Sequence, residues 1–346
     1  MDAVSHKRLY ATLHACGKRP MSATTYNLLA SIATLTVGMR LSGQPCRWAG
    51  IWIVFPALLA VLALTASSAQ QPTVPNVPAS KLVRETIYIE VNDGHTDVKF
   101  MFRSRKQTPK GSQTHLYVET EQAMAGILVA VNDHPLTEQQ KQAELDHLAW
   151  LQNDPDALRK KRAHEKDDSD HTQKIMKALP DAFLYQYDGT VKGTARLGHE
   201  GHDLVRLKFT PNPAYSPPSR IEQVLTGMQG TLLIDAEEHR LAEIDGTLFK
   251  EVSFLWGIGG HLDKGSTFRV QQADVGVGAW EITDMKLDIT GKILFFKSLN
   301  MISDEVFSDF QRVPDHTTFA KGVELLKAQE EKFAENSSGP EAHHAQ

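Results

Sequence analysis

Apolar and polar residues alternate along most of the chain after residue 80, and a period of two is typical of half-buried β-strands. Val98, Phe100 and Phe102 are a clear example. Short turn sequences separate the alternating stretches, and this spacing favours one large antiparallel sheet or open barrel. The predicted strands are residues 86–91, 98–103, 116–118, 126–131, 183–187, 204–210, 231–235, 240–250, 251–256, 266–273, 279–289 and 293–299.

Two helices are predicted between these groups of strands. Thr137 is a favourable N-cap residue, and the helical pattern after it continues through Leu151. Residues 157–179 predict a second helix, whose charged centre lacks an apolar stripe and is expected to be a solvated face. The expected fold class is therefore α+β, with a large antiparallel sheet and a helical insertion at residues 136–180.

Residues 1–69 differ from the rest of the chain in charge and predict a leader. They contain six basic residues and one acidic residue, so that the net charge of −5 becomes −10 on residues 70–346. Residues 51–66 are uncharged and mostly apolar, and small residues up to Ala69 follow them, as in a secretory signal. We expect cleavage after Ala69 and a periplasmic or secreted protein with no permanent membrane span. Residues 1–38 are too long for the basic region of a signal, so Met39 is a candidate start, and the alternative to a signal is a single membrane anchor.

The rest of the chain is expected to fold as one domain. Three prolines in residues 70–80 predict an extended linker, residues 81–334 the domain, and the polar residues 335–346 a disordered tail. Both cysteines, Cys16 and Cys46, lie in the leader, which excludes a disulfide, a cysteine–metal site or a cysteine nucleophile from the domain. The acidic charge argues against nucleic acid as a partner.

His199-Glu200-Gly201-His202-Asp203 is the densest group of possible metal ligands. A zinc-protease helix needs two histidines four residues apart, whereas here they are three apart and beside glycine. Two interpretations stay open, a polar turn between strands and a loop that folds back around a metal. No serine-hydrolase elbow is present, and the glycines of residues 257–260 lie between strands, where a phosphate loop would need a helix. We expect no catalytic residue, no metal site and no cofactor.

Large apolar residues on neighbouring predicted strands form the main candidate site. The helices either cover this face of the sheet completely or leave it partly open, as a mostly apolar pocket for an acyl chain or another hydrophobic ligand. The candidate ligand-binding residues are Phe249, Phe254, Trp256, Phe268, Val270, Trp280, Ile282, Met285 and Phe295.

Residues 204–297 resemble the periplasmic lipoprotein-carrier superfamily, which includes outer-membrane lipoprotein carrier and sorting proteins and the related sensor domain of sigma-factor regulators. The similarity is carried by Leu233-Ile234-Asp235, which ends a strand before a turn, and by Ala279-Trp280-Glu281-Ile282 in a later strand. The resemblance implies an open half-barrel of antiparallel strands, with helices packed on the concave side or forming a lid, and a lipid or lipoprotein acyl chain as ligand. The layout is also similar to secreted proteins of soil bacteria, which implies no reaction.

The sequence therefore predicts an exported, non-enzymatic protein that binds a hydrophobic ligand in the concave face of the sheet. Two alternatives stay open. One is an envelope sensor or interaction module that meets a protein partner through a sheet edge or face. The other is a metal-dependent hydrolase that uses His199, His202 and Asp203.

Overall fold

The computed structural model describes residues 77–92, 98–254, 260–276, 278–293 and 297–338. The leader with its expected cleavage point, most of the expected linker, and residues 339–346 lie outside these ranges. Within them the helices are α3 (Ala79–Asn92), α4 (Glu138–Asn153), α5 (Pro155–Ala182), the short α6 (Arg220–Gln223) with a 3-10 turn after it, and α7 (Phe319–Ser338). No helix in the described ranges is long and apolar enough to cross a membrane.

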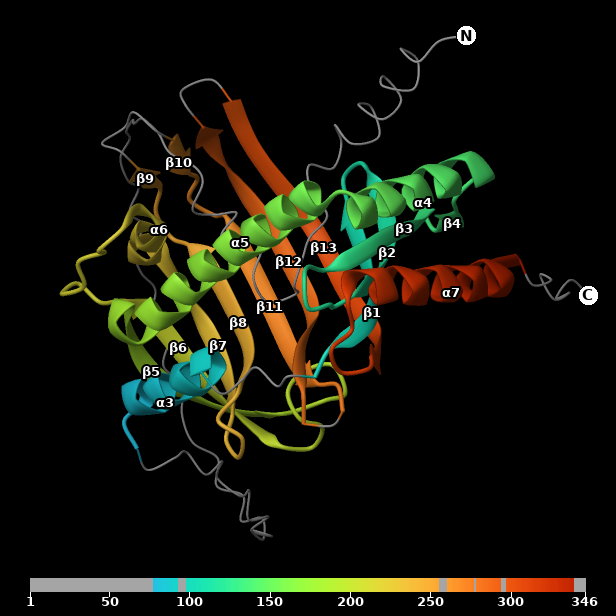
Figure 1. The fold of residues 1–346 in the computed structure, drawn as a ribbon. Coiled ribbons are helices and arrows are strands. Elements are labelled where there is room, and N and C mark those ends of the chain that lie inside the picture. Colours follow the sequence, from blue (N-terminus) through green and yellow to red (C-terminus); the bar gives the residue numbers. More distant parts are fainter. Residues whose placement is uncertain (1–76, 93–97, 255–259, 277, 294–296, 339–346) are drawn as a thin grey trace, which may run out of the picture.

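Twelve of the thirteen strands in the described ranges, all except β9, form one antiparallel sheet. Its order is β4-β3-β2-β1-β13-β12-β11-β8-β7-β6-β5, and β10 pairs with β12. The last strand thus lies between β1 and β12 and joins the two groups of strands into one sheet (Figure 1). The strands are β1 (Phe100–Thr108), β2 (Gly111–Val118), β3 (Ala125–Val131), β4 (His134–Pro135), β5 (Phe183–Lys192), β6 (Asp203–Pro211), β7 (Met228–Asp235), β8 (Leu241–Leu248), β9 (Val252–Phe254), β10 (Gly260–Leu262), β11 (Thr267–Asp274), β12 (Trp280–Ile293) and β13 (Lys297–Arg312).

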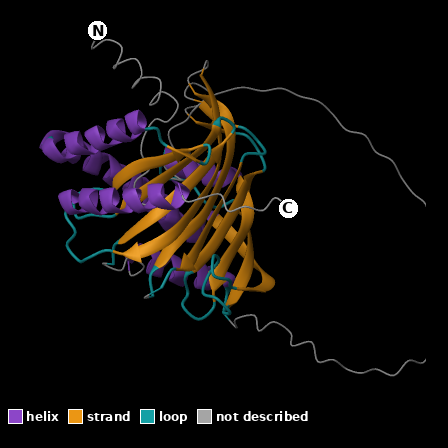
Figure 2. Cartoon of the chain, turned by 90° about the vertical axis from the view of Figure 1, so that its right-hand side faces the viewer, coloured by secondary structure: helices purple, strands orange, loops and turns teal. Residues whose placement is uncertain are grey.

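Helices lie on both faces of this sheet (Figure 2). We call the face covered by α3 and α5 the inner face, because these helices and the strands behind them share the largest apolar core (Figure 1). The outer face of β1–β3 is covered by α4 and α7, which form a second core with Leu116, Ile127 and Val129. The α+β class with an open, curved antiparallel sheet, predicted from the sequence, is confirmed.

The prediction of a strand at residues 86–91 is wrong, because these residues are the second half of helix α3. The buried residues of α3 include Leu82, Val83, Thr86, Ile87 and Glu90, which recur with the helical spacing of three or four. Apolar and polar residues alternate in residues 86–91, as they do in a strand. A window of six residues is too short to separate this period of two from the spacing of buried residues in a helix.

The predicted break between the strands at residues 279–289 and 293–299 is also misplaced, since β12 continues through Thr290 and Gly291 to Ile293. Strand β10 pairs with β12 at this point, and Leu262 lies opposite Gly291. A Cβ atom at Gly291 would lie only 2.1 Å from the carbonyl oxygen of His261. The glycine therefore permits close approach of a third strand.

Helix α4 begins after the predicted N-cap, Thr137, whose side chain accepts a hydrogen bond from the backbone of Gln140.

Candidate functional site

The first part of the inner face, over β5–β8, is a closely packed core. Helix α3 contributes Leu82, and the last third of α5 contributes Ile175 and Leu179, all at most 2% exposed. They share one apolar cluster with Leu207 and Phe209 of β6. Because apolar side chains fill the space between helices and sheet, this part of the inner face is covered.

The candidate ligand-binding residues fall into three groups. Phe268, Val270, Ile282 and Met285 come together in the inner-face core and are buried. Trp280 is buried in a separate small cluster with Leu204, Leu233 and Ala242, and Phe249, which follows β8, is half-buried. Trp256, Phe295 and the side chain of Phe254 lie outside the described residues.

The second part of the inner face, over β13, β1 and β2, carries a group of aromatic rings. The Phe102 ring lies 5.5 Å from those of Tyr117 and Phe310 and 6.2 Å from that of Phe307. His115 stacks on Tyr117 with ring centres 5.6 Å apart. Phe310 is only partly buried against the core, and so are Leu299 and Met301 toward the other end of β13, where they lie opposite residues of β12. Apolar surface therefore stays partly accessible here.

A polar group that the sequence analysis did not identify lies beside these rings. One row across four neighbouring strands contains Lys106, Glu305, Met285 and Val270. The last two are candidate ligand-binding residues, and the first two are charged. Glu305, which is 2% exposed, accepts a hydrogen bond from Ser104 at 2.5 Å. It also pairs with the Lys106 ammonium at 3.1 Å. The charges of Lys106 and Glu305 thus compensate each other below the surface.

His115 adds a neutral imidazole to this polar group. It lies opposite Ser104 on the neighbouring strand. Burial, helped by the positive charge of Lys106, lowers the pKa of His115 to about 4. The ring is therefore uncharged at neutral pH, which suits its stacking on Tyr117.

Helix α5 crosses the inner face (Figure 1), and the burial of its side chains differs between its first and last parts. Its buried residues are confined to 172–182, and none of residues 155–171 is buried. In this first stretch Lys161 and Glu165 form an ion pair of 2.8 Å, and Glu165 accepts a hydrogen bond from the backbone N–H of Met124 at 3.2 Å. Leu158 at its start packs against the core of α4 and α7. The helix is thus anchored at both ends, with polar contacts between them.

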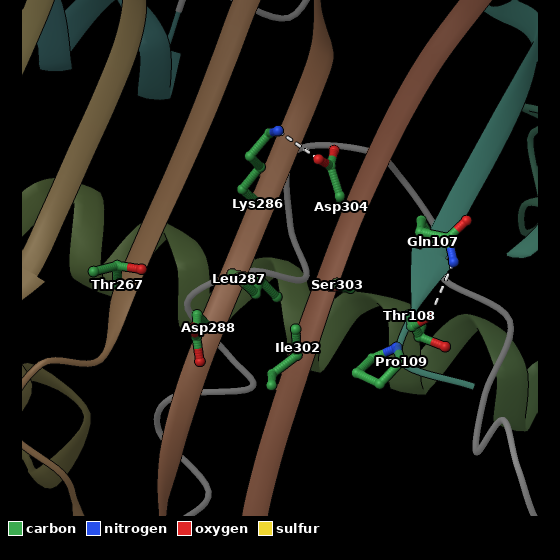
Figure 3. Close-up of a pocket in the computed structure, with 10 residues that line it drawn as sticks. All are labelled: Gln107, Thr108, Pro109, Thr267, Lys286, Leu287, Asp288, Ile302, Ser303 and Asp304. Atoms are coloured by element: carbon green, nitrogen blue, oxygen red, sulfur yellow. Dashed lines mark hydrogen bonds and ion pairs between the residues drawn. The ribbon is translucent and has the colours of Figure 1, made fainter. Parts of the chain in front are cut away.

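A pocket of about 440 Å³ lies on the outer face, between β11, β12, β13 and the turn after β1 (Figure 3). Lys286 pairs with Asp304 on its rim, and Asp288 lies opposite Ile302. These residues alternate with Leu287 and Ser303, so their side chains point away from the inner face. The pocket is separate from the candidate ligand-binding residues of the inner-face core.

The His199–Asp203 motif lies away from the inner-face core, in the turn between β5 and β6. The rings of His199 and His202 stack with their centres 4.0 Å apart. Asp203 does not join them, because its carboxylate pairs with Lys192 at 2.9 Å. Burial lowers the pKa of His202, but the hydrogen bond and charge of Asp235, with Glu237 and Glu238, outweigh it and raise that pKa above its ordinary value.

Comparison with known proteins gives only distant similarities. No family model matches the chain, and no curated protein matches it. A crystal structure of a putative outer-membrane lipoprotein-sorting protein domain from Vibrio parahaemolyticus is 9% identical, with a TM-score of 0.29, over 71% of this chain and 99% of that chain. A DUF1329 family protein from Desulfovibrio piger is 10% identical, with a TM-score of 0.24, over 68% of this chain and 94% of that chain. Neither similarity assigns a family or a function to this chain.

Proposed function

We propose that the protein is an exported, non-enzymatic carrier that binds an amphiphilic lipid between the inner face of β13, β1 and β2 and the first part of α5. The observation that carries this proposal is the mismatch between these two surfaces. The sheet offers the partly buried apolar residues Leu299, Met301 and Phe310. The helix residues 155–171 include no buried side chain to match them.

The chemistry of the second part of the inner face fits a lipid with a polar head. Hydrocarbon chains pack against aromatic rings and methionine, which are large and adaptable apolar surfaces. Lys106 is 28% exposed in its side chain and lies beside the aromatic rings. Its ammonium, which pairs with Glu305, would bind a phosphate or carboxylate head group as an additional partner. The expected ligand is therefore an acyl chain with an anionic head.

Entry of the ligand requires movement of α5. Its first part is held over the sheet by the Lys161–Glu165 pair and the bond of Glu165 to Met124. Contacts of this kind stabilise by about 1 kcal/mol each or less, whereas the apolar packing at residues 172–182 is stronger. Residues 155–171 are therefore the part of the cover that opens, and residues 172–182 stay in place. The expected leader, residues 1–69, supplies export.

The test is mass spectrometry of an organic extract of the purified protein, compared among three forms. Met301→Glu places a charge on the inner face, and the matched control Ile302→Glu places it on the outer face, where Ile302 is 38% exposed. We expect lipid in the native extract, at least about tenfold less lipid with Met301→Glu, and an unchanged amount with Ile302→Glu.

Thermal or urea unfolding of the same three forms separates binding from folding. Similar unfolding of Met301→Glu and native protein, with lipid lost only in the variant, supports the proposal. A native protein that carries no lipid, or equal lipid loss in both variants, contradicts it. A native protein without lipid that retains an envelope protein through its sheet edge would favour the interaction-module alternative.

A further inference from the structure

Three turns meet at the end of the sheet away from the β12–β13 hairpin, and they bring histidines and carboxylates together. The turn between β5 and β6 supplies His199 and His202, the turn between β7 and β8 supplies Asp235 and Glu238, and Asp274 ends β11. We call these five residues the histidine–carboxylate cluster. The first turn is held in place by two backbone hydrogen bonds, from Gly198 N to Gln272 O and from Asp274 N to Gly198 O.

The Nδ1 atoms of both histidines face carboxylate oxygens. Glu238 Oε1 lies 2.8 Å from Nδ1 of His199 and 4.0 Å from Nδ1 of His202. Asp274 Oδ2 lies 3.3 Å from Nδ1 of His199. Asp235 Oδ2 lies 3.0 Å from Nδ1 of His202. One side of each ring is thus directed to a shared group of oxygens.

The second oxygen of each carboxylate is fixed by another hydrogen-bond donor. Trp280 Nε1 donates to Glu238 Oε2 at 2.9 Å. The N–H of Gly276 donates to Asp274 Oδ1 at 2.8 Å. Asp235 Oδ1 accepts from the N–H groups of Glu237 and Glu238 at 2.9 Å. Outer contacts of this kind orient the ligands of metal sites and leave one oxygen of each carboxylate for the centre.

Three carboxylates face two imidazole rings in the cluster, so negative charge predominates there among the residues that the structure describes. His199 Nδ1 is buried and makes no hydrogen bond with any residue that the structure describes, although two carboxylate oxygens lie within 3.3 Å of it. The neighbouring cation, Arg240, is already paired with Glu90 at 2.8 Å. Carboxylate oxygens gathered around two imidazole rings are an electrostatic setting that a bound cation stabilises.

We propose that the cluster binds one divalent transition-metal ion of the zinc class, with His199, His202 and Glu238 as ligands and one oxygen of Asp235 or Asp274 as the fourth. Trp280 orients Glu238. Imidazole together with carboxylate selects such ions over Ca²⁺ and Mg²⁺, which prefer oxygen ligands only. Ligands of a tetrahedral zinc ion lie roughly 3.3–3.5 Å apart. The distances of 2.8–4.0 Å between the facing atoms span that value, so small side-chain rotations complete the site. This site is distinct from the proposed lipid site.

The test is calorimetric titration of the chelator-treated protein with Zn²⁺, supported by the visible absorption of bound Co²⁺. We expect one Zn²⁺ per chain, bound at least about tenfold more tightly than Ca²⁺ or Mg²⁺. His199→Gln and His202→Gln should each weaken binding more than about 100-fold, and Trp280→Phe, which removes an orienting bond, by about 10-fold. Asp203→Asn is the matched control: it alters the same sequence motif, yet Asp203 pairs with Lys192, so binding should not change.

Unfolding of the histidine variants and of Asp203→Asn without metal should match that of the native protein, which separates loss of ligands from loss of fold. Trp280 also packs in a buried cluster, so the binding loss of Trp280→Phe counts only under conditions in which unfolding shows that variant to be folded. Zn²⁺ should raise the melting temperature of the native protein and of Asp203→Asn, but not of the His199→Gln/His202→Gln double variant. Absence of Zn²⁺ binding in the native protein overturns the proposal. So does equal binding by the double variant, because other histidines would then hold the metal. Neither result affects the lipid test, which concerns residues of the inner face.

Discussion

The two parts of the inner face have the same strand pattern but different covers. Over β5–β8, buried Leu207 and Phe209 meet apolar side chains of α3 and of the end of α5. Over β13, β1 and β2, aromatic rings alternate with Ser104, Lys106 and Glu305, and the helix residues 155–171 include none that is buried. One sheet therefore combines a region closed by apolar packing with a region closed by polar contacts.

This difference separates stability from the proposed binding. Apolar burial stabilises in proportion to the area removed from water, and close packing makes each removed atom costly. Polar contacts at a cover contribute little net free energy and break at little cost. The closed region is therefore expected to hold the fold together, while the other region can open without unfolding the protein.

The largest expected effect comes from the closed region. Phe209 is 2% exposed, and its ring centre lies 4.6 Å from that of Phe183. Phe209→Ala should therefore lower the free energy of unfolding by about 3–5 kcal/mol. Urea unfolding measures this loss. Phe310→Ala, in the partly open region, should cost clearly less, and an equal loss for both variants would remove the distinction between the two regions.

The sequence predicts one large sheet, its antiparallel arrangement and the positions of α4 and α5, because alternation and the Thr137 cap are local signals. The placement of β13 between β1 and β12 could not be predicted, since no local pattern states which distant strand will pair. Residues 86–91 show the limit of a short alternating pattern. Six residues cannot distinguish a strand from a helix whose buried positions happen to coincide.

The candidate sites were predicted only in part. Phe268, Val270, Ile282 and Met285 do come together, because alternation assigns the face of each strand. Lys106 and Glu305 were missed, since charged residues in an alternating strand are ordinarily on the solvent side. For the histidine motif, the sequence places His199 and His202 near each other, but Glu238 and Asp274 reach them from other turns only in the fold.

The next largest effect is a pH dependence that arises in the partly open region. The pKa of His115 is about 4 in the folded protein and 6.5 in its ordinary state. Above pH 6.5 the ring is neutral in both the folded and the unfolded chain, and its contribution to stability is complete. As the pH falls from 6.5 to 4, only the unfolded chain takes up the proton, which lowers the free energy of unfolding by about 3 kcal/mol.

Urea unfolding at several pH values, for the native protein and for His115→Gln, isolates this contribution. Other acids of the protein titrate in both forms, so the difference between the two curves belongs to His115. We expect that difference to change between pH 6.5 and 4 and to be constant above pH 7. If the free energies of unfolding of the two proteins depend on pH in parallel over the whole range, the His115 ring is not desolvated. The partly open region would then be a solvated surface.

The smallest expected effect concerns α5 itself, where both kinds of cover occur in one helix. Glu165→Ala removes the bond to Met124 and the ion pair with Lys161, whose side chain is only 13% exposed, and should lower the free energy of unfolding by about 1–2 kcal/mol. Its main effect should be local. Amide hydrogen exchange in residues 155–171 should be faster than in residues 172–182 of the native protein, and the variant should accelerate the first stretch alone.

Glu324→Ala in α7, an exposed residue paired with Lys321, is the control and should leave exchange in α5 unchanged. Uniform exchange along α5 in both proteins would mean that the helix opens as one unit, and the division of the inner face would then not extend to its cover.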